Sequence, residues 1–282
     1  MKKMDTQIQI VLQEEIYEDF LSRIRAWATE VLERTGLLSP PPHLTITIWK
    51  TVEKFRAFDR VEREALGIAT GEEAEFLATH DAWREYPRIH VCQERLIGIP
   101  DAIIQGVVHY EVGHVLHHDT PEFYTFRFSS RLQEAGRTCG MDLPLLQQCV
   151  YFLSVAIKDQ EVIQGLGKMG LGFSQRALLQ YLLLDTQEER QTWEVVQGSS
   201  ALRKIAFAAF LKTLLPVEVL ISAGIEEDQA LKNQWNEAYA WLPERERKDL
   251  FPWARYVLSH EAKIFQERLE QAAIRLIADP SL

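Results

Sequence analysis

Histidines concentrate in one short stretch of this 282-residue chain. Four of the eight histidines fall within residues 109–118, and Glu111 lies among them. On a helix, at about 100° per residue, Glu111, His114 and His118 point into the middle of an apolar arc. That arc consists of Ile103, Ile104, Val107, Val108 and Val115. Imidazole and carboxylate groups placed together can bind a metal ion or transfer protons, so this segment is the candidate site.

The remaining two histidines of the segment, His109 and His117, fall on the opposite side of the same helix. We expect them to be solvated or to cap the helix. Taken alone, His114 fits a buried neutral imidazole bonded to a backbone carbonyl equally well. Its combination with Glu111 and His118 favours a functional site, because a carboxylate on an apolar face costs several kcal/mol unless it is paired or near a cation.

A second inward carboxylate is expected on the helix predicted over residues 145–166. The polar stripe of that helix includes Ser154, Lys158 and Glu161, whereas Asp159 projects among Phe152, Val155 and other apolar residues. Asp159 is interpreted either as one half of a buried pair with an arginine or histidine, or as a metal ligand. In the second case it completes a site with the histidines of the earlier helix.

The string Tyr-Glu-Val-Gly-His at residues 110–114 resembles the metal-binding helix of zincin metallopeptidases, in their gluzincin-like layout. These families place His-Glu-x-x-His on a helix after a small sheet, and a later helix supplies a third, acidic ligand. The resemblance covers roughly residues 44–166. It implies a zincin-like fold, a zinc cofactor and a peptide substrate, with His114 as a ligand and Glu111 as the general base that activates water.

Tyr110 stands where the family has its first histidine. A phenol, with a reference pKa near 10, is a poor ligand at neutral pH unless the metal deprotonates it. His109 is adjacent in sequence but on the other face, and only a π-bulge would bring it round. Two ligand sets therefore stay open. One combines His114, Asp159 and Tyr110. The other combines His114, His118 and Asp159, with Glu111 as a fourth ligand or as the base.

Two further alternatives concern the acidic residues. Glu161 is the residue type that such enzymes often use as the third ligand, whereas the helical face favours Asp159. The spacing of Glu111 and His114 also matches one half of a di-iron site in a helical bundle. The chain has no second Glu-x-x-His, so the di-iron interpretation is weaker.

The elements that must position these groups are helices, apart from a small N-terminal sheet. Strands are predicted at 44–49, 74–79 and 88–92, and helices at 13–34, 52–66, 102–118, 145–166, 176–184, 202–215, 228–241 and 254–277. The predicted fold class is α+β and predominantly helical: a zincin-like small sheet with its active-site helix, followed by an all-helical C-terminal region. We expect residues 1–170 to form the zincin-like region and residues 171–282 to pack on it in one compact unit.

Composition narrows the function classes. With 46% hydrophobic and 26% charged residues, the chain is globular rather than disordered. Its net charge of −10 and the lack of a basic stripe argue against nucleic acid as a partner. We expect a cytoplasmic protein, because its three cysteines are irregularly spaced and the sequence has no signal-peptide pattern. We expect no membrane partner, because Lys212 and Glu218 interrupt the apolar stretch at 205–225.

Two functions follow from these expectations. The first is a metallopeptidase-like protein with an altered zinc site, in which water activated by zinc attacks a peptide carbonyl with Glu111 as general base. The alternative is a non-catalytic zincin-fold protein that binds a peptide or protein without metal and joins Tyr110 to Glu111 by hydrogen bonds. The same substitution at Tyr110 motivates both hypotheses.

Overall fold

The computed structural model describes residues 6–14, 17–35, 38–66, 77–84, 86–222, 229–259 and 264–279. Over these residues the protein combines a small sheet with many helices, which confirms the predicted α+β, mostly helical class. The chain forms two compact units, Met1–Pro121 and Glu122–Leu282. The boundary predicted after residue 170 falls inside the second unit, between α6 (Leu143–Lys168) and α7 (Gly172–Leu182).

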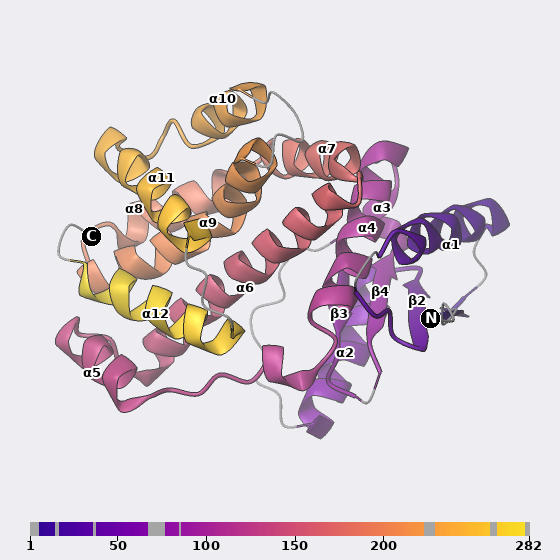
Figure 1. The fold of residues 1–282 in the computed structure, drawn as a ribbon, viewed down its shortest axis with the longest axis horizontal. Helices are drawn as coiled ribbons and strands as arrows, with labels where there is room; N and C mark the ends of the chain where they lie inside the picture. The colour runs from indigo at the N-terminus through magenta and orange to yellow at the C-terminus, as the bar shows by residue number, and fades with distance from the viewer. Residues whose placement is uncertain are drawn as a thin grey trace. The chain divides into compact units, whose positions relative to one another are not determined.

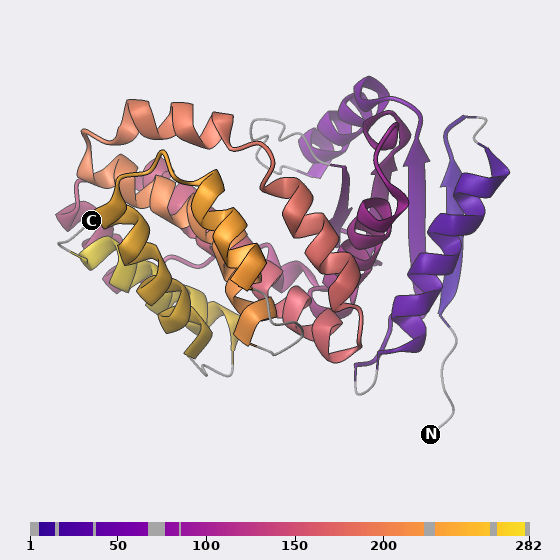
Figure 2. The same ribbon diagram turned by 90° about the horizontal axis from the view of Figure 1, so that it is seen from above.

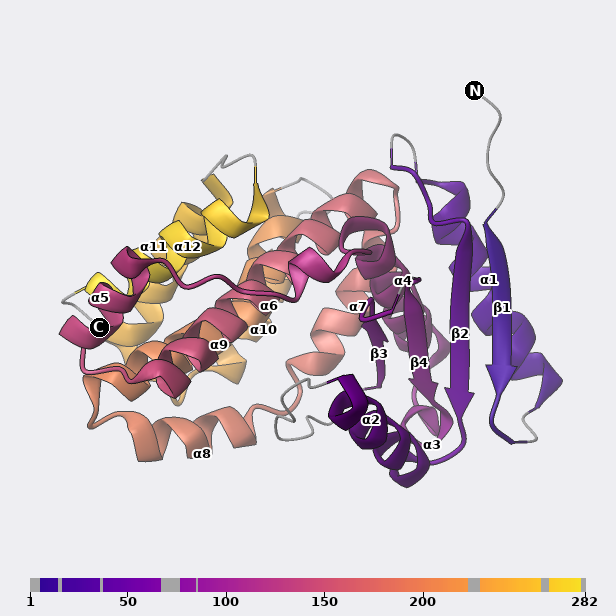
Figure 3. The same cartoon turned by 90° about the horizontal axis from the view of Figure 1, so that it is seen from below.

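The first unit is built on a four-stranded sheet with the strand order β1-β2-β4-β3, which can be followed in Figure 3. Its strands are β1 (Gln7–Leu12), β2 (His43–Trp49), β3 (Ala78–Asp81) and β4 (Arg88–Cys92). The strands β1, β2 and β4 run parallel, and β3 is antiparallel to β4. Consequently β1 and β3 form the two edges of the sheet.

The strand predictions agree with the structure in the centre of the sheet and fail at its edges. Alternation predicts that β2 is half-buried, but Thr47 is only 6% exposed, so the face that was expected to meet water is covered as well. Edge strand β1 is absent from the prediction. The other edge was expected at 74–79, whereas β3 runs over Ala78–Asp81, and residues 74–76 lie outside the described part of the chain.

Helices enclose this sheet and connect its parallel strands. Helix α1 leads from β1 to β2 and buries Ile24, Ala28 and Val31, which follow one another at helical spacing. Helix α4 packs against α1 and runs beside β3 and β4. The helical segments of this unit are α1 (Glu18–Glu33), α2 (Val52–Leu66), α3 (Gln93–Leu96) and α4 (Asp101–His117). They match the predicted helices at 13–34, 52–66 and 102–118 to within a few residues.

The described part of the second unit is helical, and α6 and α9 pack along each other at its centre (Figure 1). Helix α9 is long and apolar enough to cross a membrane. Of its most apolar stretch, 72% is buried inside the protein, as in the core helices of other proteins. After the short 3₁₀ turn Pro121–Phe123, the helices are α5 (Ser130–Thr138), α6, α7, α8 (Gln187–Val196), α9 (Ser200–Ser222), α10 (Gln229–Ala238), α11 (Glu244–Ser259) and α12 (Phe265–Ala278).

Four helices of this unit differ from the sequence prediction. The helix expected at 254–277 corresponds to parts of α11 and α12, and residues 260–263 between them lie outside the described part of the chain. Helices α5 and α8 are absent from the prediction. Each is short and polar, and α8 buries only Trp193, so neither shows an apolar stripe in its sequence.

Candidate functional site

Helix α4 is buried on nearly every side, and this determines the surroundings of all its ionisable groups. The exposed fraction is 5% for Glu111, 2% for His114 and 0% for His118. The helix runs unbroken from Asp101 to His117, without a π-bulge. It ends at His118, whose backbone N–H donates to the His114 carbonyl at 2.7 Å. The inward orientation predicted for these three side chains agrees with their burial.

The solvated position predicted for His109 is wrong. The side chain is 0% exposed, because α1 packs on the face of α4 that was expected to meet water. Its Nε2 lies 3.4 Å from the Glu30 carboxylate, which also accepts hydrogen bonds from Gln105 and Arg34. Burial lowers the pKa of His109 to about 4, although the charge of Glu30 opposes this. His109 is therefore a neutral interior residue at pH 7.

A histidine that the sequence did not single out reaches Glu111 from the edge of the sheet. His80, on β3, places Nδ1 2.7 Å from Oε2 of Glu111. An ionised carboxylate only accepts hydrogen bonds, so in that state of Glu111 the proton lies on Nδ1 of His80. This bond fixes one oxygen of Glu111 and leaves the other side of the carboxylate to act on a further group.

His114 forms the centre of an imidazole cluster with His80 and His118. The rings of His80 and His114 are stacked, with centroids 4.1 Å apart and planes 13° apart. The Nδ1 atoms of His114 and His118 face each other at 3.3 Å. Two facing nitrogens share a hydrogen bond only if one carries the proton and the other accepts it. The pair therefore keeps at least one imidazole neutral in this arrangement.

Tyr110, the residue at the position of the family's first histidine, packs on this cluster. Its ring meets that of His114 edge to face, with centroids 4.6 Å apart and planes at 85°. This is a favourable geometry for two aromatic rings. The structure therefore gives Tyr110 a packing contact with His114, and its role as a metal ligand stays a prediction.

Behind His80, a buried ionic network fastens β3 to the rest of the first unit. Arg88 on β4 donates to Asp81 on β3 and to both carboxylate oxygens of Glu62 on α2, at 2.5–3.1 Å. His90 Nε2 lies 3.0 Å from Asp81, and His90 Nδ1 accepts from the Trp49 indole N–H at 3.1 Å. Because the indole can only donate, Nδ1 of His90 is unprotonated and its proton lies on Nε2.

The charges of this network are strongly coupled. Burial alone raises the pKa of Asp81, but its hydrogen bond to His90 and the charge of Arg88 outweigh burial and lower it. In the same way, Arg88 and Arg84 lower the pKa of Glu62 against the effect of burial. Both carboxylates are therefore ionised at neutral pH and hold the strand that carries His80.

The acidic candidates on α6 belong to the second unit. Asp159 is 7% exposed, which agrees with its predicted inward orientation. Glu161 forms an ion pair with Arg268 of α12 at 3.0 Å, so its carboxylate has a structural partner within the second unit. Lys158, the residue before Asp159, is also buried. Its ammonium lies over the Tyr124 ring, and burial lowers the pKa of Lys158 to about 8. The role of Asp159 as a ligand stays a prediction.

Among the described residues, no group of three or more His, Cys, Asp or Glu side chains is arranged to hold a metal ion. In the first unit, the Nδ1 atoms of His114 and His118 face each other as a pair. No protein-family model matches the chain, and neither curated proteins nor solved structures gave a match. The resemblance to zincins therefore rests on the residues of the sequence alone.

Proposed function

We propose that the first unit carries an altered zincin-type hydrolytic site centred on His114, His118 and Glu111. The supporting observation is the 3.3 Å separation of the two facing Nδ1 atoms. Two imidazole nitrogens bound to one tetrahedral zinc at about 2.0–2.1 Å are separated by about 3.3 Å. The spacing of these two nitrogens therefore matches that of two ligands of one zinc ion.

The donor set suits zinc in its chemistry but holds only two facing nitrogens. Neutral imidazoles are common zinc ligands, and catalytic sites combine three protein ligands with one open position. When bound, zinc supplies Lewis-acid activation of a water molecule. Within the first unit, Tyr110 remains the candidate from the sequence for the third position.

Within this proposal, Glu111 acts as the general base for hydrolysis of a peptide bond. His80 holds Oε2 of Glu111 at 2.7 Å, so the direction of the carboxylate is fixed before substrate binds. The other oxygen, Oε1, accepts the proton of the attacking water. His80 is thus a positioning residue that acts through Glu111, and its stacking on His114 places base and ligand side by side.

The second candidate is a metal-free protein of the same fold that binds a peptide or protein. It is favoured by the lack of a third metal-holding side chain among the described residues and by the aromatic packing of Tyr110. Here Glu111 bonds to His80, whereas this hypothesis predicted a bond to Tyr110.

The metal content of untagged protein, measured by plasma mass spectrometry, tests the first candidate. We expect about one zinc per chain, lost in His118→Ala and retained in His117→Ala, a neighbouring histidine that is more exposed. Because imidazoles bind a metal ion only in their neutral form, zinc affinity should rise with pH. A wild-type protein that takes up no zinc at micromolar concentration contradicts the proposal and leaves the metal-free candidate.

Peptide hydrolysis is tested separately from zinc binding. Glu111→Gln is expected to keep zinc and abolish cleavage of a peptide library, because the amide cannot accept a proton from water. A variant that cleaves at the wild-type rate contradicts the role of Glu111 as the base.

A further inference from the structure

The second unit carries a hollow on its outer side, where Trp241 lies opposite α8. Its volume is about 450 Å³. Helix α8 runs along the outside of this unit, near the top of Figure 2. Six residues line the hollow: Thr186, Gln187, Arg190, Gln191, Glu194 and Trp241. One aromatic ring and a set of polar side chains therefore border the same space.

The indole ring of Trp241 is held in a fixed orientation. Its N–H donates to Oγ1 of Thr186 at 3.1 Å, and the Thr186 hydroxyl donates in turn to the Ala238 carbonyl at 2.8 Å. The rings of Phe210 and Tyr239 pack on the indole, with centroids 5.8 and 5.6 Å away. The part of the ring that borders the hollow is therefore in place before a ligand binds, which lowers the entropic cost of binding.

The stripe of α8 that faces the hollow is polar along its whole length. Gln187, Arg190, Gln191 and Glu194 follow one another at helical spacing, and all four are exposed. A helix stripe beside a large aromatic ring is ordinarily apolar and packs on that ring. Here polar side chains border the ring and a hollow takes the place of packing. Such a local departure from the usual pattern is expected at a binding site.

We propose that the hollow binds a neutral oligosaccharide, with one sugar ring stacked on Trp241 and its hydroxyl groups bonded to α8. The amides of Gln187 and Gln191 both donate and accept hydrogen bonds, as sugar hydroxyls do. The apolar C–H face of a sugar ring suits the face of an indole. Arg190 Nε donates to the Glu194 carboxylate at 3.1 Å, so the two charges of the stripe compensate each other. A ligand without net charge therefore matches this surface.

Two other classes of ligand that bind to aromatic rings fit this hollow less well. Nucleotides stack on aromatic rings, but their phosphates favour a positively charged groove. Among the described residues that line the hollow, Arg190 is the one cation, and it is paired with Glu194. Quaternary ammonium ions are held by cages of several aromatic rings, whereas Trp241 is the one ring among these lining residues.

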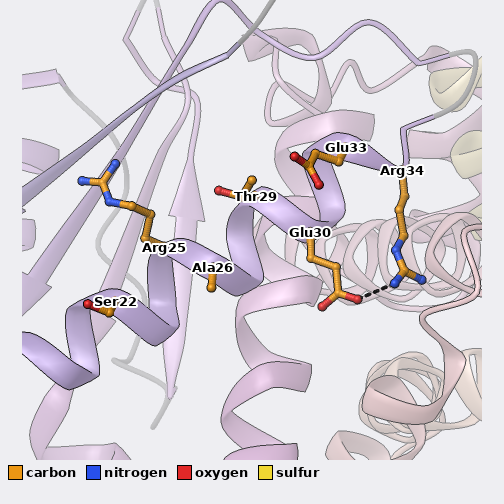
Figure 4. Close-up of a pocket in the computed structure, with 7 residues that line it drawn as sticks. All are labelled: Ser22, Arg25, Ala26, Thr29, Glu30, Glu33 and Arg34. Carbon is orange, nitrogen blue, oxygen red and sulfur yellow. Dashed lines mark hydrogen bonds and ion pairs between the residues drawn. The ribbon is translucent and has the colours of Figure 1, made fainter.

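A hollow over α1 in the first unit provides a contrast (Figure 4). It has a volume of about 520 Å³, and every described residue that lines it belongs to α1 or follows it directly. Glu30 and Arg34, two of these residues, pair with each other at 2.7 Å. None of the described lining residues is aromatic. This hollow therefore lacks the ring on which the assignment to a sugar depends.

Saturation-transfer NMR of the full chain tests the proposal, with cellotriose, maltotriose and triacetylchitotriose as probes. We expect saturable binding of at least one of them at millimolar concentration. Trp241→Ala should weaken it about tenfold, because the stacking surface is lost. Trp241→Phe keeps an aromatic face and should retain most of the binding. Thr192→Ala is the control, since Thr192 is an exposed residue of α8 that does not line the hollow.

A double variant tests the same hollow without altering the ring. Gln187→Ala with Gln191→Ala changes two exposed residues, so the fold should persist, and the loss of two hydrogen-bonding groups should weaken binding about tenfold. Wild-type protein that binds none of the probes, or a double variant that binds as tightly as the wild type, overturns the proposal. Tighter binding of adenosine monophosphate or choline overturns it as well. Metal content stays the readout for the proposed function, so the two proposals fail independently.

Discussion

Replacing Arg88 with methionine should be among the most destabilising single changes in the first unit. The guanidinium makes four hydrogen bonds to the carboxylates of Glu62 and Asp81. Methionine keeps the apolar stem but leaves two buried carboxylates without their shared cation. Removing one partner of a buried ion pair costs about 3–5 kcal/mol. We expect the free energy of unfolding at pH 7 to fall by this amount.

The pH dependence of this loss follows from the pKa directions. In the wild type, burial raises the pKa of both carboxyls, but their hydrogen bonds and Arg88 outweigh it and lower the pKa below the ordinary value. Their stabilisation is therefore present above about pH 4 and is lost as the pH falls. In Arg88→Met, burial raises the pKa of Asp81 and Glu62, so acidification now relieves the buried charge. The difference between the two proteins should shrink from pH 7 towards pH 4.

Urea unfolding followed by circular dichroism measures both effects, and Arg84→Met is the matched control. Arg84 pairs with the same Glu62 at 2.8 Å, but its side chain is 48% exposed. An exposed ion pair contributes about 0–1 kcal/mol. The reasoning is refuted if Arg88→Met costs no more than Arg84→Met, or if its cost is the same at pH 4 and pH 7.

Two other buried groups give predictions of known sign. The pKa of His109 is lowered from 6.5 to about 4, so between these pH values the unfolded chain binds a proton at this residue and the folded protein does not. Stability should fall by up to about 3 kcal/mol as the pH drops from 6.5 to 4, and His109→Gln should remove this part of the slope, as urea unfolding at each pH can show. The ammonium of Lys204 donates to the carbonyls of Ile277 and Asp279 at 2.6 Å. Lys204→Met should therefore lower the unfolding free energy by about 2–3 kcal/mol and speed hydrogen exchange in the last turn of α12; unchanged exchange there would contradict it.

The sequence predicted those parts of the fold whose side chains repeat at a regular spacing. Helix α4 and strands β2 and β4 were found because their apolar residues recur along the segment. Strand β3 was misplaced because it has only four residues. Strand β1 was missed although Gln-Ile-Gln-Ile alternates at its start, and its partner β2 lies far away in the chain. A period of 3.6 or 2 says nothing about such partners.

The same limit applies to the candidate site. Spacing alone brought Glu111, His114 and His118 to one face of a helix, and all three are buried there. It could not indicate His80, which reaches Glu111 from a strand 31 positions earlier. Helical spacing also predicted, wrongly, that His109 is exposed to solvent. An amphipathic pattern cannot show that a second element, here α1, packs on the polar side of a helix. A His-Asp pair in a short polar strand was the only local signal for His80.

The adjacent residues His80 and Asp81 give β3 two attachments on opposite faces of the sheet. One contacts Glu111, and the other belongs to the Arg88 network. Both attachments therefore contribute to the free energy that keeps this four-residue strand ordered. A ligand that binds on the His80 side and favours the ordered strand therefore also stabilises the ion pairs on the other side. By linkage, protonation of Asp81 weakens the binding of that ligand by the same free energy. Double-mutant cycles across β3 should therefore show non-additive effects on the free energy of unfolding.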